Sequence, residues 1–334
     1  MADELSSSSL QKGYVIAGAA GFIGSHLVET LLGEGSVVLG IDNYLTGRQE
    51  NISHFVSNAN FISIRGDISC LEDGCFQSAR QFLESREFES TYVFNFASAA
   101  SPVIYQEFQI ETLMTGSLGT KNLLDLATET SSRFIQASTS EIYGNPKVHP
   151  QVEEYHGDVD PIGPRSMYDE AKRFGEALVT SYVNTRNTNA GIVRIFNTYG
   201  PRMREDDGRV IPNFASQALS NSDVTIYGDG KQTRSMCFVA DLVRGIIELG
   251  NSTFRGVLNL GNPEEITMLE LAEKIIKVTG SRSKIVHLPM SPGDPERRRP
   301  DISRAMKVLS WQPEITLSQG LDLTIPWYRE QLGI

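Results

Sequence analysis

Three glycines in the stretch "VIAGAAGFIGSHLVETLL" constrain the fold more than any other feature of this 334-residue chain. Gly18, Gly21 and Gly24 directly follow an apolar strand pattern and stand at the start of a helix pattern. Glycines at such a place permit a tight turn and a close approach of the backbone to a pyrophosphate, which the amide groups of a helix N-terminus attract. The spacing therefore predicts a dinucleotide-binding turn; glycines that serve packing alone are the alternative.

Short apolar runs and amphipathic stretches alternate through the first part of the chain. The strand patterns "YVIAG", "SVVLGID", "TYVFNFA" and "RFIQAS" are separated by helix patterns, of which those at about 104–128 and 166–185 are the longest. This order predicts right-handed crossovers and a parallel sheet with helices on both faces, which is a doubly wound α/β fold of the Rossmann type.

After residue 197 the sequence contains stretches rich in Gly, Arg and Asp, which predict loops. Loops of this composition between secondary-structure elements usually carry binding functions. We expect a smaller C-terminal lobe that binds the substrate. The predicted organisation is a disordered tail at 1–12, a Rossmann domain at 13–197 that also receives 235–262, and the smaller lobe at 198–234 and 263–334.

The composition of the chain limits the kinds of molecule that it is expected to bind. The formal net charge of -11 argues against binding to nucleic acid or to an anionic membrane, because both require a basic face. The three cysteines have no close pair with the spacing of metal ligands, so neither a disulfide framework nor a metal site is expected. The N-terminus has no apolar h-region, and no apolar run is long enough to span a bilayer. We expect a cytoplasmic protein with a small-molecule substrate.

Acidic residues follow the second and third predicted strands. Asp42 stands about 20 residues after the glycines, where its carboxylate would accept hydrogen bonds from the adenosine ribose and would repel a 2′-phosphate. NAD is therefore preferred over NADP. Asp67 is a candidate adenine contact, with a turn-forming role as its alternative, and Ala97 and Ser98 are small residues beside the expected nicotinamide path.

Tyr168 and Lys172 in "SMYDEAKRFGEAL" stand four residues apart and hence on one face of the predicted helix. A nearby ammonium group and an oxidised nicotinamide both stabilise a phenolate, which lowers the pKa of a tyrosine toward that of a useful base. We expect Tyr168 to take a proton from a substrate hydroxyl. Chance neighbours on a helix surface are the alternative.

Together with Thr139, these residues resemble the extended short-chain dehydrogenase/reductase superfamily, which acts on nucleotide sugars, over nearly the whole chain. Within it, "STSEIYG", "DPIGPRSMYDEAKR", "RIFNTYGPRM", "YGDGKQTRS" and "RPDI" are similar to the UDP-glucuronate decarboxylase family, also called UDP-xylose synthases. The resemblance implies a carboxy-lyase with tightly bound NAD. The sugar is oxidised at its 4-position, carbon dioxide leaves from the 5-position, and the hydride returns to give UDP-xylose.

The resemblance also implies roles for individual residues. Tyr168 would be the base, Lys172 its electrostatic partner, Thr139 a hydrogen-bonding partner of the sugar 4-hydroxyl, Glu141 the acid at the reacting end, and Arg234 the residue that faces the substrate carboxylate. The implied cofactor contacts are Gly18, Gly21, Phe22, Ile23, Gly24, Asp42, Asn43, Thr46, Gly47, Asp67, Ile68, Ala97, Ser98, Thr115, Tyr168 and Lys172. The implied substrate contacts are Tyr105, Ser140, Asn197, Arg209, Val210, Tyr227, Arg234 and Arg298, of which Asn197, Arg209, Val210, Tyr227 and Arg298 would serve the nucleotide end.

Several alternatives stay open at this point. Many 4,6-dehydratases carry Asp at the position of Ser140, although GDP-mannose dehydratases read Thr-Ser-Glu as this chain does. Epimerases seldom place Glu at position 141, and a non-catalytic NAD-binding scaffold would be expected to lose Tyr168 or Lys172. Glu141 as a solvated loop charge is a further alternative. Met114 and Gly116 replace residues that are common in the family, which leaves the exact sugar open. The family also implies a homodimer through a four-helix interface formed by 104–128 and 166–185.

Overall fold

The computed structural model describes residues 10–289 and 297–334. At its centre lies a seven-stranded parallel sheet with the strand order β11-β6-β5-β4-β1-β2-β3. The strands are β1 (Gly13–Ala17), β2 (Val37–Asp42), β3 (Phe61–Arg65), β4 (Thr91–Asn95), β5 (Arg133–Thr139), β6 (Ala190–Ile195) and β11 (Val257–Leu260). The crossovers carry helices, so the predicted doubly wound α/β fold is confirmed.

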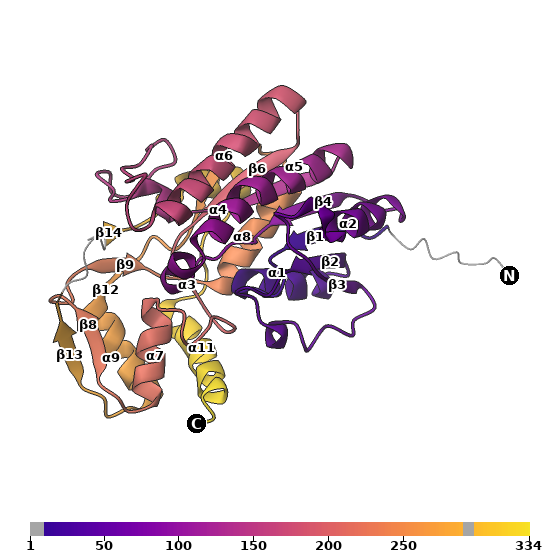
Figure 1. The fold of residues 1–334 in the computed structure, drawn as a ribbon. Helices are drawn as coiled ribbons and strands as arrows, with labels where there is room; N and C mark the ends of the chain where they lie inside the picture. Colours follow the sequence, from indigo (N-terminus) through magenta and orange to yellow (C-terminus); the bar gives the residue numbers. More distant parts are fainter. Residues whose placement is uncertain (1–9, 290–296) are drawn as a thin grey trace.

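Helices cover both faces of this sheet (Figure 1). Successive side chains of a strand point to opposite faces: Tyr14 and Ile16 of β1 pack with the helices of one face, and Val15 and Ala17 pack with those of the other. The first face carries α1 (Phe22–Gly33) and α8 (Val239–Asn251), and the second carries α2 (Cys75–Glu84), α5 (Thr120–Glu129) and α6 (Ser166–Arg186). Both sides of the sheet are therefore buried, as a parallel sheet requires.

The helix predicted at 104–128 is not continuous, which corrects the sequence analysis. The structure has α3 (Pro102–Glu107), α4 (Gln109–Met114), a π-helical turn η3 (Thr115–Gly119) and then α5. Phe108 separates α3 from α4 because its backbone, at φ -111° and ψ 59°, is not helical. Gly116 lies in the π-turn, where a Cβ atom would stand 2.6 Å from the Cβ of Ala171 on α6. The helix predicted at 166–185 is confirmed as α6.

The C-terminal part of the chain packs against the α1 and α8 side of the sheet, and its core is continuous with the core there. Its helices are α7 (Val210–Leu219), α9 (Met268–Thr279), α10 (Ser303–Leu309) and α11 (Leu317–Gln331). Its strands form three small sheets: β8 (Val224–Tyr227) with β13 (Ile285–Leu288), β7 (Thr198–Tyr199) with β10 (Cys237–Phe238), and β9 (Thr233–Ser235) between β12 (Glu265–Thr267) and β14 (Arg297–Arg298). Short helical turns lie at η1 (Gln49–Asn51), η2 (Leu71–Asp73) and η4 (Ser140–Tyr143). The proposed domain boundaries stay a prediction.

The N-terminal tail was predicted to be disordered over 1–12, and residues 1–9 of it lie outside the described residues. Gln11 and Lys12 are described, and their side chains donate hydrogen bonds to Gly35 and Asn251. Among the described residues there is no helix whose length and apolar character would let it cross a bilayer. Over the same ranges, no group of three or more His, Cys, Asp or Glu side chains is placed to hold a metal ion.

Candidate active site

The glycine-rich turn lies at the carboxyl end of β1 and leads into α1. Gly18 has a positive φ of 81°, and a Cβ atom on it would lie 2.6 Å from the carbonyl group of Phe96. A Cβ atom on Gly24 would lie only 1.9 Å from the carbonyl oxygen of Gly18. Glycine is therefore required at both positions, because the helix N-terminus and the loop after β4 approach the turn closely. The N-cap residue of α1 is Gly21, which has no side chain to cap the amide groups at the start of the helix, so they are available to an anion.

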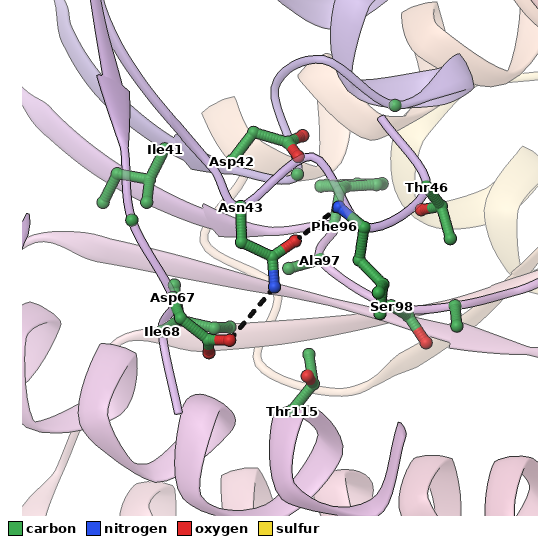
Figure 2. A pocket seen from close by; sticks show the side chains of 15 residues that line it. Ile41, Asp42, Asn43, Thr46, Asp67, Ile68, Phe96, Ala97, Ser98 and Thr115 are labelled. Carbon is green, nitrogen blue, oxygen red and sulfur yellow. Dashed lines mark hydrogen bonds between the residues drawn. The ribbon is translucent and has the colours of Figure 1, made fainter. Parts of the chain in front are cut away.

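Asp42 lies beside this turn, at the end of β2 (Figure 2). Its two carboxylate oxygens accept hydrogen bonds from the amide groups of Ala20 and Tyr44, both at 2.8 Å. Burial raises the pKa of Asp42, and these amide hydrogen bonds oppose that effect. Each carboxylate oxygen retains a lone pair for a ribose hydroxyl. The orientation of Asp42 thus suits the role that its position in the sequence suggested.

A pocket opens along the carboxyl edge of the sheet, and Figure 2 shows the residues around it. Asn43 joins two of its walls by donating a hydrogen bond to Asp67 at 3.0 Å. Ten of the expected cofactor residues line it: Gly18, Gly21, Asp42, Asn43, Thr46, Asp67, Ile68, Ala97, Ser98 and Thr115. The sequence analysis missed five others, namely Ile41, Leu45, Gly66, Phe96 and Ala99. Each of them is adjacent in the sequence to an expected residue, so extending the expected stretches by one residue would have found them.

Tyr168 and Lys172 lie on α6 and face the end of β5. The Tyr168 side chain is hydrogen-bonded to Thr139, and the Lys172 ammonium lies 5.8 Å from the centroid of the Tyr168 ring. Lys172 also donates a hydrogen bond to the carbonyl oxygen of Ala137 at 3.0 Å. Tyr105 stacks on the Tyr168 ring with centroids 5.0 Å apart and planes 7° from parallel. The structure thus brings together the tyrosine, lysine and threonine that the sequence singled out.

The pKa values of this pair differ from the expectation. Burial raises the pKa of Tyr168 well above its ordinary range, although the hydrogen bond with Thr139 opposes that rise. Burial lowers the pKa of Lys172 to about 8, because an ammonium group is poorly solvated there. The lowered phenol pKa that we expected from the sequence is therefore not a property of the chain alone. The cationic nicotinamide would have to supply the rest of the effect.

Glu141 is the second residue of η4 and directly follows Thr139 and Ser140, and its side chain is largely buried. One carboxylate oxygen forms an ion pair with Arg165 and the other with Arg298. Burial by itself would raise the pKa of Glu141, but the two guanidinium groups outweigh it and hold the pKa below its usual range. The side chain is 15% exposed, so the alternative that Glu141 is a solvated loop charge is wrong.

Arg165 is the main residue of this cluster that the sequence analysis missed. It precedes Tyr168 by three residues at the start of α6, so its position one turn before the predicted base was a usable signal. Arg298 lies on β14 in register with Arg234 on β9, and both side chains are buried. Arg234 also helps to lower the pKa of Glu141. The resemblance assigned Arg298 to the nucleotide end of the substrate, whereas in this structure it pairs with Glu141.

Four other expected substrate residues lie after β6 in the chain, namely Asn197, Arg209, Val210 and Tyr227. Arg209 is the N-cap residue of α7, which begins at Val210, and its side chain forms an ion pair with Asp207. Tyr227 ends β8 and is 46% exposed. Asn197 follows β6, and its carbonyl oxygen accepts a hydrogen bond from the amide of Cys237 at 2.9 Å. None of these residues lines the pocket of Figure 2, so their roles stay predictions.

Comparison with known proteins identifies the family. The model of the GDP-mannose 4,6-dehydratase family matches residues 15–324. UDP-glucuronic acid decarboxylase 2 of Arabidopsis thaliana is 45% identical over 318 residues, which are 95% of this chain and 68% of that protein. UDP-glucuronic acid decarboxylase 1 of Danio rerio is 43% identical over 322 residues, which are 96% of this chain and 74% of that protein.

Solved structures agree with this relationship. The UDP-glucuronic acid 4-epimerase of Bacillus cereus, in complex with UDP-glucuronic acid and NAD, superposes with a TM-score of 0.82 at 28% identity, covering 96% of this chain and 99% of that one. The UDP-glucose 4-epimerase of Thermotoga maritima gives a TM-score of 0.84 at 28% identity, with the same coverage. The chain therefore belongs to the GDP-mannose 4,6-dehydratase family of extended short-chain dehydrogenases/reductases and, within it, to the UDP-glucuronic acid decarboxylases.

Proposed function

We propose that this chain is a carboxy-lyase that converts UDP-glucuronate to UDP-xylose and regenerates its NAD in each cycle. The observation that carries the proposal is the buried Glu141 carboxylate, which is held by Arg165 and Arg298 close enough to Tyr168 to raise the pKa of that residue further. The names of the curated relatives support the same reaction.

The residues present fit NAD. Gly18 and Gly24 leave space that a Cβ atom would fill, and the uncapped amide groups of α1 suit the pyrophosphate. Asp42 is oriented to accept hydrogen bonds from the adenosine ribose, and Asn43 and Asp67 form the adenine side of the pocket. When bound, NAD accepts a hydride from the sugar 4-carbon and returns it after carbon dioxide has left.

Tyr168 takes the proton of the sugar 4-hydroxyl, and Thr139 hydrogen-bonds to the same hydroxyl. The hydrogen bond from Thr139 favours the phenolate form of Tyr168. Lys172 adds a positive charge because, with a pKa of about 8, it is mostly protonated at neutral pH. These three side chains therefore serve the oxidation that many enzymes of this superfamily share.

The arginines provide charge for an anionic substrate. Arg165, Arg234 and Arg298 all lower the pKa of Glu141, so three positive charges lie around this carboxylate. A sugar acid joined to a diphosphate brings negative charge at both ends, which guanidinium groups can bind through charge-assisted hydrogen bonds. Repulsion between Glu141 and the substrate carboxylate ends when carbon dioxide leaves, so the site favours the decarboxylated state.

The assay that tests the proposal mixes the purified chain with NAD and UDP-glucuronate. We expect release of carbon dioxide and formation of a UDP-pentose in equal amounts, as measured by mass spectrometry. The Tyr168→Phe variant is the control and should release none. A UDP-hexuronate isomer without carbon dioxide would instead assign a 4-epimerase, which is the activity named for the Bacillus cereus neighbour. Conversion of a neutral nucleotide hexose to a 4-keto-6-deoxy sugar would assign a dehydratase.

A homodimer belongs to the same proposal. α4 and α6 pack against each other, and with η3 they leave apolar side chains exposed: Ile110 at 64%, Leu118 at 47% and Phe174 at 50%. A second copy of this chain would cover them by pairing the same helices in a four-helix bundle. Leu118→Glu should shift the sedimentation coefficient from that of a dimer to that of a monomer. Leu323→Glu, an equally exposed leucine on α11, should leave it unchanged. The expected cytoplasmic location stays a prediction.

A further inference from the structure

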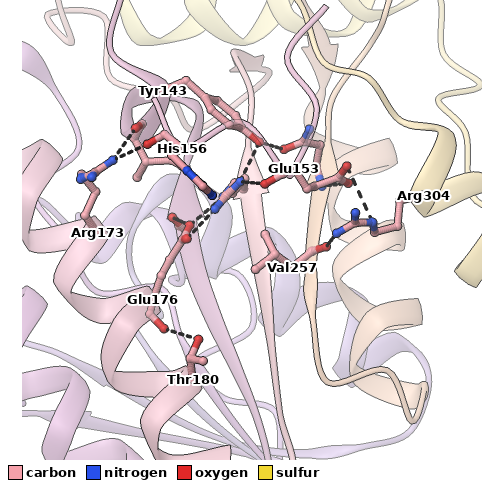
Figure 3. A network of polar contacts seen from close by, with 12 residues as sticks. Tyr143, Glu153, His156, Arg173, Glu176, Thr180, Val257 and Arg304 are labelled. Carbon is pink, nitrogen blue, oxygen red and sulfur yellow. Dashed lines mark hydrogen bonds and ion pairs between the residues drawn. The ribbon is translucent and has the colours of Figure 1, made fainter. Parts of the chain in front are cut away.

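A largely buried polar network connects α6 to β6, to β11 and to residues 143–156 (Figure 3). At its centre, the Arg194 guanidinium of β6 donates hydrogen bonds to both carboxylate oxygens of Glu176, at 2.9 and 2.8 Å. Its third nitrogen donates to the Tyr143 hydroxyl at 2.9 Å and to the Glu153 carbonyl oxygen at 2.8 Å. Only 10% and 13% of the Arg194 and Glu176 side chains are exposed. The guanidinium is thus bound on all sides.

The turn that follows Thr139 is held by the same network. Tyr143, at the end of η4, donates a hydrogen bond to the side chain of Asn259 on β11 at 2.8 Å. Arg173 of α6 donates to the carbonyl oxygen of Ile142 at 3.1 Å. Because β6, β11 and α6 all contribute, the turn that carries Glu141 cannot shift without breaking buried hydrogen bonds.

Glu176 shares one helix face with the two residues at the reaction centre. Tyr168, Lys172 and Glu176 occupy the i, i+4 and i+8 positions of α6. The three contact consecutive residues at the end of β5. The Tyr168 side chain bonds to Thr139, Lys172 donates to the Ala137 carbonyl oxygen at 3.0 Å, and Glu176 accepts from the Ser138 hydroxyl at 2.6 Å.

We propose that Glu176 is a positioning residue for Tyr168, through its simultaneous contacts with Arg194 and Ser138. The inference rests on the proposed function, since it concerns the base of that reaction. An α-helix is stiff, and the eight residues between Glu176 and Tyr168 span about 12 Å at about 1.5 Å per residue. Fixing Glu176 against β5 and β6 therefore fixes how far Tyr168 lies from Thr139. Displacements of about 1 Å in such a geometry cost up to about a hundredfold in rate.

Ser138→Ala and Glu176→Gln test this role together. Ser138→Ala removes the contact with β5 and leaves the ion pair with Arg194 intact, so it should fold normally. The matched control is Thr180→Ala, whose hydroxyl lies one turn further along α6 and donates a hydrogen bond to the Glu176 carbonyl oxygen of its own helix. We expect kcat to fall about tenfold in both test variants, with the KM for UDP-glucuronate within about twofold of the wild type. Thr180→Ala should match the wild type.

The pH profile distinguishes positioning from a merely structural role. The hydrogen bond with Thr139 lowers the pKa of Tyr168, so loosening it should move the acidic limb of the kcat profile to higher pH. A variant that loses thermal stability but keeps the wild-type kcat and pH profile well below its melting temperature would overturn the proposal.

A spectroscopic measurement keeps the inference separate from the proposed function. The phenolate absorbance of Tyr168 is titrated in the NAD-loaded protein, with Tyr168→Phe subtracted as background. If the wild type does not decarboxylate UDP-glucuronate, the proposed function fails, but the titration still reports on Glu176. A higher phenol pKa in Ser138→Ala and Glu176→Gln supports positioning, and an unchanged pKa refutes it.

Discussion

Glu141→Gln should weaken catalysis and yet tighten the binding of UDP. Glu141 forms an ion pair with Arg298. The resemblance places Arg298 at the nucleotide end of the substrate, so UDP has to displace the Glu141 carboxylate before it can use that guanidinium. The substitution replaces the carboxylate by an amide of nearly the same shape and removes the competing charge.

The magnitude follows from the charges around Glu141. Two unit charges about 4 Å apart attract each other by about 4 kcal/mol at an effective dielectric constant of about 20. Arg165 stays on the other carboxylate oxygen and screens part of this attraction. If about a third of it opposes UDP, removing the carboxylate gains about 1.4 kcal/mol, which is about tenfold in affinity. The same change removes the Glu141 anion from Arg165 and Arg298, so the protein measured without substrate should lose about 3–5 kcal/mol of unfolding free energy.

Isothermal titration calorimetry with UDP measures the affinity, and carbon dioxide release measures catalysis. We expect about tenfold tighter UDP binding and at least about a hundredfold slower release, with NAD binding unchanged. The matched control is Glu154→Gln, which makes the same change in net charge at an exposed carboxylate paired with Arg304. Weaker or equal binding of UDP by Glu141→Gln would refute the competition between Glu141 and the nucleotide.

Two further predictions follow from the cofactor site and the buried lysine. Gly24→Ala should lose NAD binding in calorimetry, because its Cβ atom would stand 1.9 Å from the Gly18 carbonyl oxygen, and overpacking of this kind costs about 1–3 kcal/mol or more. Gly33→Ala, at the open end of the same helix, should bind NAD normally. Lys172→Met should raise the melting temperature at pH 7 more than at pH 10. Burial lowers the pKa of Lys172 from 10.5 to about 8, so its charge destabilises the folded state at neutral pH and this cost fades as the pH rises from about 8 to 10.5. An equal gain at both pH values would contradict this account, and the exposed Lys121→Met should show no such difference.

Burial shifts the pKa values of Tyr168 and Lys172 in opposite directions. Burial disfavours charge on both side chains, and the phenolate is the form that needs the most help. A Tyr168 phenolate would therefore depend on the positive charge of an oxidised nicotinamide beside it.

Much of the fold and the reaction centre was predictable because local sequence encodes it. The glycine turn, Asp42 and the pair of Tyr168 and Lys172 are each defined by spacing within one strand, turn or helix, and a parallel sheet brings the carboxyl ends of its strands to one edge. The break at Phe108 was not predictable in the same way, since apolar periodicity continues through it.

The sequence by itself determined that Tyr168 and Lys172 lie together, because helical periodicity puts them on one face wherever the helix lies. Only the tertiary structure decided what surrounds Glu141. Arg165 and Arg298 stand 24 and 157 residues away from it, and β14 brings Arg298 into place only after the C-terminal part of the chain has packed against the sheet. The same holds for Glu176, whose partners lie on β5 and β6. Buried charges need partners from any distance along the chain, and local sequence patterns carry no record of which ones folding will supply.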